Sequence, residues 1–205
     1  MLTELYNFLI DLHNIEGYIS FDGGSDSLMK GDEIGLGDPI EDQVTIASIN
    51  NLDKINEKML VVIGYGSDKF NGVTNEDSMK AISEITKRNG FLGTFSLIKD
   101  SDEYNFYKDL ISLIQNQSFK SIISCNILSS AEGDYGSDIR SPFILENKRL
   151  DPSDLNINIL YSILFFFDIE KVAERSLVIP IIKNCETVID CEIQLKEFRR
   201  SLCKI

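Results

Sequence analysis

The feature that most constrains the fold is a continuous apolar run, Met59-Leu60-Val61-Val62-Ile63, which leads directly into Gly64-Tyr65-Gly66-Ser67-Asp68. A short apolar run of this kind is typical of a parallel strand that is buried on both faces. A helical pattern over 75–88 follows, and a strand at 17–21, a Gly-rich loop and a helix at 40–53 precede it. The repeated order of strand, loop and helix predicts an α/β domain of the Rossmann-like, three-layer type, with a short, mostly parallel sheet.

The remaining periodicity is mostly helical. It predicts a third strand at 91–97 and further helices at 3–13, 102–116, 119–131, 154–174 (with a break near Asp168) and 187–202. We treat residues 1–205 as a single α/β domain. Three strands make a thin sheet for 205 residues. We therefore expect something to complete it: a partner, a second copy in a homo-oligomer, or an N-terminal half that this chain lacks.

Charge and composition exclude several partners. The chain has 33 acidic and 20 basic residues and a net charge of −13, which opposes binding to nucleic acid and to anionic membranes. The most apolar stretch, 157–167, is too short to span a bilayer, and the first residues lack the basic segment of a secretory signal. We expect a cytoplasmic protein. His13 is the only histidine, so Ser/His/Asp and Cys/His catalysis and zinc sites lack their usual residues.

One short pattern occurs three times, as Gly24-Ser25-Asp26, Gly66-Ser67-Asp68 and Gly136-Ser137-Asp138. The first two copies follow predicted strands. Ligands of open parallel sheets bind outside the carboxyl ends of the strands, where glycine admits close approach and Ser or Asp can contact the ligand. The alternative is that Gly-Ser-Asp is only turn chemistry. Because two copies end consecutive strands, we favour a ligand site.

Acidic residues are concentrated between Asp22 and Asp42. They are suited to bind a divalent cation such as Mg²⁺, with Asp26 and Glu33 as its first candidate ligands, or to act as a general base; the other reading is a solvated loop. A calcium loop is not supported, because Ser27 stands where that loop needs glycine. Gly64-Tyr65-Gly66 lacks the third glycine of a dinucleotide fingerprint, since Lys69 occupies that position.

Several of these segments resemble one family. The stretch from Asp22 to Glu33, then Leu36-Gly37-Asp38-Pro39, the segment from Ile63 to Asp68, Gly90-Phe91-Leu92-Gly93, and Glu132-Gly133-Asp134-Tyr135-Gly136 followed by Phe166-Phe167-Asp168 are similar to the family of domain of unknown function 1152. The resemblance covers roughly residues 17–170 and corresponds to the C-terminal part of the family's pattern. It implies a Rossmann-like α/β protein with no assigned activity, in which the chain is a shortened relative or a fragment.

Two functions remain open. The first is binding of a small polar metabolite, such as a nucleotide or sugar phosphate, with or without catalysis. Its site would consist of the Gly- and Asp-rich loops: Asp22, Gly23, Gly24, Ser25, Asp26, Asp32, Glu33, Gly64, Gly66 and Asp68. The second is a non-catalytic interaction module that uses Phe165–Phe167 and an exposed sheet edge.

Overall fold

The computed structural model describes residues 2–67, 71–115, 121–145 and 155–202. In chain order the elements are α1 (Leu2–His13), β1 (Gly17–Gly23), the 3₁₀ turn η1 (Asp26–Leu28), α2 (Ile40–Asn50), β2 (Glu57–Ile63), α3 (Asn75–Thr86), β3 (Phe91–Ser96), α4 (Asp102–Gln115), α5 (Ile122–Glu132), α6 (Pro142–Leu145), the 3₁₀ turn η4 (Ile159–Ser162), β4 (Ile163–Asp168), α7 (Ile169–Ala173), α8 (Ile179–Ile182) and α9 (Val188–Leu202). None of the described helices is both long and apolar enough to cross a membrane.

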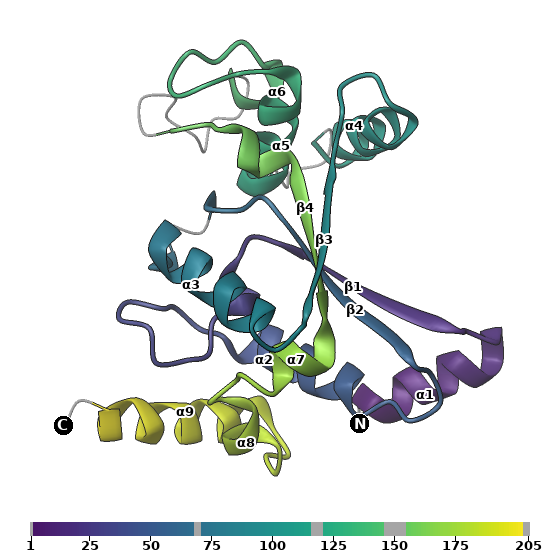
Figure 1. Ribbon diagram of the computed structural model, residues 1–205, viewed down its shortest axis with the longest axis vertical. Coiled ribbons are helices and arrows are strands. Elements are labelled where there is room, and N and C mark those ends of the chain that lie inside the picture. Colours follow the sequence, from purple (N-terminus) through teal and green to yellow (C-terminus); the bar gives the residue numbers. More distant parts are fainter. Residues whose placement is uncertain (1, 68–70, 116–120, 146–154, 203–205) are drawn as a thin grey trace.

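Strand β2 lies between two hydrophobic cores. Its alternate side chains point to opposite faces of the sheet: Leu60 and Val62 pack into one core with residues of α1, α2, α3 and α7, whereas Val61 and Ile63 pack into the other with α4, α5 and α6. Figure 1 shows these two groups of helices on either side of the strands. Burial on both faces explains the continuous apolar sequence of β2 and confirms the predicted α/β architecture.

The sheet is mixed, which corrects the expectation of a mostly parallel one. Its strand order is β1-β2-β4-β3; β1 pairs with β2 in parallel, and β4 pairs antiparallel with β2 and β3. Strands β1, β2 and β3 thus share one direction, and β4 is inserted between β2 and β3 in the opposite direction. The sheet has four strands within the described residues, one more than the sequence predicts.

The missed strand lies in the predicted helix 154–174. Residues 163–168 (Ile-Leu-Phe-Phe-Phe-Asp) form β4. Periodicity cannot separate a short, uniformly apolar strand from a buried helix, and only the pairing partners decide between them. The predicted break near Asp168 is real, because its side chain accepts a hydrogen bond from Glu170 N at 2.9 Å at the start of α7.

Elements with strong local signals match their predictions closely. Thr74 and Asp77 form a capping box at the start of α3, the helix predicted over 75–88: Thr74 Oγ1 accepts from Asp77 N at 3.1 Å, and the Asp77 carboxylate accepts from Thr74 N at 3.1 Å. Helix α3 therefore begins where the sequence places it.

Candidate functional site

A cavity of about 550 Å³ lies at the carboxyl ends of β1 and β2, and we call it the β1–β2 cavity. Carboxylates from the end of β1, from η1 and from the region where α2 begins line one side, and we call them the acidic side: Asp22, Asp26, Asp38, Glu41 and Asp42. The amino end of α5 contributes Ser121, Ile122 and Ile123. Gly23, Ser67 and Asn71 complete the lining. The cavity thus gathers four separate stretches of the chain at one edge of the sheet.

Two glycines at the strand ends allow these stretches to come together. Gly24 N donates to Ile63 O at 2.7 Å and ties the loop after β1 to the end of β2. Gly64 has a φ of 82°, and a Cβ there would lie 3.0 Å from Ile123 Cγ2 and 3.3 Å from Ser67 Oγ. A side chain at residue 64 would therefore be strained and would push against the start of α5.

Asp22 supplies a carboxyl with a raised pKa to the cavity. Burial raises the pKa of Asp22 from 3.8 to about 6; Ser27 beside it lowers the pKa, and the negative charge of Asp26 raises it. The Asp26 carboxylate is oriented by Asn71, whose Nδ2 donates to Asp26 Oδ2 at 2.6 Å. A carboxyl that titrates near neutral pH inside a cavity is a feature of functional sites.

Ser67 adds an independent sign of a ligand. The residue is only 7% exposed, and none of the described groups forms a hydrogen bond with its Oγ. A buried hydroxyl without a partner is costly, and native structures rarely tolerate it without a functional reason. Its position in the lining of the cavity gives the hydroxyl a natural partner in a bound molecule.

The structure separates the predicted site residues. Asp22, Gly23 and Asp26 line the β1–β2 cavity, with Gly24 and Gly64 in its backbone frame. The side chain of Ser25 is buried away from solvent, 2.9 Å from Ser78 Oγ. Asp68 lies outside the described residues.

The two predicted metal ligands do not share a cavity. Glu33 lines a second cavity of about 220 Å³, together with Asp32 and Arg175. Its carboxylate accepts from Lys30 N at 2.9 Å and Gly31 N at 2.8 Å and lies 3.8 Å from the Arg175 guanidinium, so it stabilises its own loop. In the part of the chain that the structure describes, no three His, Cys, Asp or Glu side chains are grouped closely enough to hold a metal ion.

Gly66 lines a further cavity, of about 270 Å³, whose polar residues are mainly amides. It lies on the other side of the loop after β2, next to Asn75, Asn158 and Tyr161. The Tyr161 hydroxyl donates to Gly66 O at 3.4 Å, which anchors this loop to the residues before β4. Gly66 therefore shapes the neighbouring cavity and not the one that contains Asp22.

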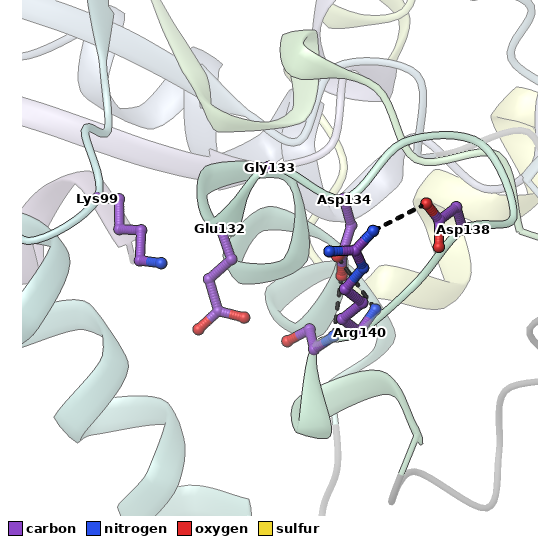
Figure 2. A pocket seen from close by; sticks show the side chains of 7 residues that line it. Lys99, Glu132, Gly133, Asp134, Asp138 and Arg140 are labelled. Atoms are coloured by element: carbon purple, nitrogen blue, oxygen red, sulfur yellow. Dashed lines mark hydrogen bonds and ion pairs between the residues drawn. The ribbon is translucent and has the colours of Figure 1, made fainter.

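The third Gly-Ser-Asp copy lies away from the β1–β2 cavity, and Figure 2 shows its Asp138 beside Arg140. It lies beside a cavity of about 350 Å³ in the loop after α5. Asp138 pairs with Arg140 at 3.4 Å on the surface. Asp134 accepts from Ser129 Oγ at 2.6 Å, Arg140 N at 3.1 Å and Ser141 N at 3.0 Å, which closes the loop.

Sequence reasoning missed much of the lining of the β1–β2 cavity. Asp38, Glu41 and Asp42 belong to the acidic segment that the sequence displays, but nothing local indicates that they face Asp22. Asn71 and the start of α5 carry no signal, because they reach the cavity only through tertiary packing. Ser67 belongs to the second copy of the Gly-Ser-Asp pattern, but only Gly66 and Asp68 of that copy were predicted as site residues.

Comparison with known proteins identifies a family for the chain but no individual relative. No curated protein and no solved structure matches the chain significantly. A family described as "Protein of unknown function (DUF1152)" matches residues 2–200, so the similarity extends well beyond the segments between 17 and 170 and covers nearly the whole chain. The chain belongs to the DUF1152 family.

Proposed function

We propose that this protein binds a small polar metabolite in the β1–β2 cavity. The observation that carries the proposal is the buried, unpartnered hydroxyl of Ser67 in a cavity that also contains the buried carboxyl of Asp22. A volume of about 550 Å³ suits a metabolite. We regard the domain as a Rossmann-like variant with one reversed strand, because the cavity lies where such folds bind their ligands, outside the carboxyl ends of parallel strands.

The chemistry of the lining restricts the ligand. Hydroxyl, amide and carboxylate groups predominate, which suits a molecule with several hydrogen-bonding groups. A nucleotide or sugar phosphate whose phosphate approached the acidic side would need a bridging cation such as Mg²⁺. Asp22 is the residue best placed to exchange a proton with a bound molecule, because its pKa of about 6 is close to neutral pH.

The test is thermal unfolding of the purified protein with a panel of nucleotides, sugars, sugar phosphates and amino acids, each with and without Mg²⁺. A ligand at a hundred times its Kd adds about 2.7 kcal/mol, which raises the Tm of a domain of this size by about 5–10 °C. Ser67→Ala should abolish or weaken the effect of the compound that binds. Ser137→Ala is the matched control, since it alters the exposed third Gly-Ser-Asp copy outside the cavity.

Two outcomes would contradict the proposal. One is that the protein unfolds cooperatively but no compound of the panel raises its Tm. The other is a shift of the same size in Ser67→Ala and in Asp26→Asn, which would place the ligand elsewhere.

A specific observation favours protein interaction as a second candidate, on a different surface from the one the sequence suggested. Phe165–Phe167 lies in β4, a central strand, and Phe167 is fully buried, so this segment is part of the core. An exposed apolar groove of about 600 Å³ lies between the sheet and α4. Phe21, Phe95 and Phe106 line it and are 62%, 47% and 73% exposed. Single exposed apolar residues are ordinary, but a contiguous group marks an interaction surface.

The charges at this groove indicate its partner. Asp102 and Glu103 also line it, and the chain has a net charge of −13. Self-association is therefore disfavoured, and we propose an amphipathic helix with basic residues beside its apolar stripe as the occupant. A Leu/Lys amphipathic peptide should bind the protein, and Phe106→Asp should abolish binding. Equal binding to Phe106→Asp, or none to the wild type, would exclude this candidate.

A further inference from the structure

The lining of the β1–β2 cavity combines groups of opposite electrostatic character. The acidic side carries five carboxyl groups, and no Lys, Arg or His is among the described residues that line the cavity. The lining also contains the amino end of α5, an 11-residue helix. A ligand that satisfies both parts of the lining must present a positive group to one and an electronegative group to the other.

The acidic side is suited to an organic cation. Asp26 Oδ2 accepts from Asn71 and Asp38 Oδ1 accepts from Ile40 N at 3.0 Å, so both carboxylates are held in place within the cavity. Among the described residues no three His, Cys, Asp or Glu side chains are grouped closely enough to hold a metal ion, so they do not form a multi-carboxylate cage of the kind that Ca²⁺ takes. An ammonium group suits this arrangement, because its three N–H donors can reach carboxylates that are spread around it.

The helix end supplies donors. The first backbone N–H groups of an α-helix have no acceptor within the helix, and the helix dipole favours negative charge there. In α5 the Ser121 side chain accepts from Ser124 N at 3.2 Å, which satisfies one of these groups. Ile122 and Ile123 lie in the cavity lining at the same end.

The Ser67 hydroxyl is the independent observation that points to a ligand here. Its Oγ would be 3.3 Å from a Cβ on Gly64, and that same Cβ would be 3.0 Å from Ile123 Cγ2, so the hydroxyl and the first turn of α5 lie against one glycine. The buried, unpartnered Oγ can therefore hydrogen-bond the same end of a ligand that faces the helix.

We infer that the ligand is an aminated metabolite, with its ammonium group between Asp22 and Asp26 and a carboxylate, phosphate or carbonyl oxygen at the start of α5 beside Ser67. This inference rests on the proposed function, since it names the class of molecule for the same cavity. Such a molecule needs no metal ion, because its own ammonium group neutralises the carboxylates.

The experiment compares matched pairs that differ in the amine: glucosamine 6-phosphate with glucose 6-phosphate, and L-serine with glycerate. Binding is followed by thermal unfolding and calorimetry in EDTA, so that no metal ion can replace the ammonium group. The aminated member should stabilise the protein, and its deaminated counterpart should not. Asp26→Asn should weaken that binding by about ten- to a hundredfold, the value of a hydrogen bond to a charged group. The exposed Asp53→Asn is the charge-matched control and should bind like the wild type.

A second variant keeps the test informative if Asp26→Asn does not fold. Glu41 is exposed on the first turn of α2, so Glu41→Gln should retain the fold while removing one charge from the acidic side. A deaminated member that binds as tightly as its aminated partner in EDTA would overturn the inference and leave the proposed function intact. If both variants still prefer the aminated compound as strongly as the wild type does, the ligand does not bind in this cavity. If no compound of either kind stabilises the protein, both the inference and the proposed function fail.

Discussion

Replacing Asp22 with asparagine should make the protein more stable at neutral pH. Burial raises the pKa of Asp22 from 3.8 to about 6, so the folded state binds this proton more tightly than the unfolded state does. The unfolded chain therefore ionises first, and the free energy of unfolding falls as the pH rises from about 4 to about 6. Above pH 6 the folded protein carries the full cost of a buried carboxylate.

The size of this cost follows from the pKa shift. A rise from 3.8 to about 6 corresponds to about 3 kcal/mol of stability lost at pH 8. Asparagine has nearly the same shape and no charge, so Asp22→Asn should recover up to about 3 kcal/mol at pH 8, or about 6–12 °C in Tm. About half of this gain should remain at pH 5, because there the wild-type side chain is largely protonated in the folded state.

The assay is urea or thermal unfolding of the wild type, Asp22→Asn and the exposed Asp53→Asn at several values between pH 5 and 8, above the isoelectric point of about 4.5. The difference between Asp22→Asn and the wild type should grow with pH, and the control should show no such trend. An Asp22→Asn variant that is no more stable than the wild type at pH 8 would refute the reasoning. That result would mean that a stabilising partner outweighs burial at this carboxylate.

Three further predictions concern the framework of the site. Gly64→Ala should destabilise the protein by about 1–3 kcal/mol, because residue 64 has a φ of 82° and its new Cβ would press on Ile123. Urea unfolding at constant m-value measures this loss, and an unchanged midpoint would contradict the prediction. Thr74→Ala should cost about 1 kcal/mol through loss of the α3 capping box, whereas Thr74→Ser should cost less; equal losses would argue against the cap. Arg175→Met should cost about 3–5 kcal/mol at pH 7, because the guanidinium is buried and pairs with Glu84 at 2.7 Å and, more distantly, with Glu33 at 3.8 Å, so both carboxylates would lose their cation. Arg175 holds the pKa of the Glu84 carboxyl below its usual value, so the loss should shrink only when the pH is low enough to protonate that carboxyl, and a loss that is constant with pH would show that packing dominates.

Most local elements could be predicted because their signals are local. The Thr74 capping box, the Gly133 stop after α5 and the apolar run of β2 each determine backbone conformation over one or two turns or a single strand. Strand β4 could not be predicted in this way. Its residues Ile163–Asp168 are as apolar as those of a buried helix, and it is a strand because β2 and β3 supply hydrogen bonds on both of its edges.

The residues of the candidate site likewise include some that the sequence predicts correctly and some that only the tertiary structure places. Sequence alone indicated Asp22 and Asp26 because they follow a strand in a Gly-rich loop, and the structure places both in the β1–β2 cavity. It also grouped Glu33 with Asp26, since the two lie close in the chain. The structure separates them, because Glu33 binds backbone N–H groups of its own loop and faces Arg175.

The sequence by itself thus determined the order of strands and helices as far as α5, the positions of the glycine turns and the accumulation of acidic side chains between Asp22 and Asp42. Only the tertiary structure decided that β4 lies between β2 and β3, and that the amino end of α5 packs beside Gly64 and lines the same cavity as the acidic side. The physical reason is the range of the forces involved. Capping, turn formation and periodicity act over a few residues, whereas strand pairing and the lining of a cavity depend on residues that are brought together only when the cores on both faces of the sheet form.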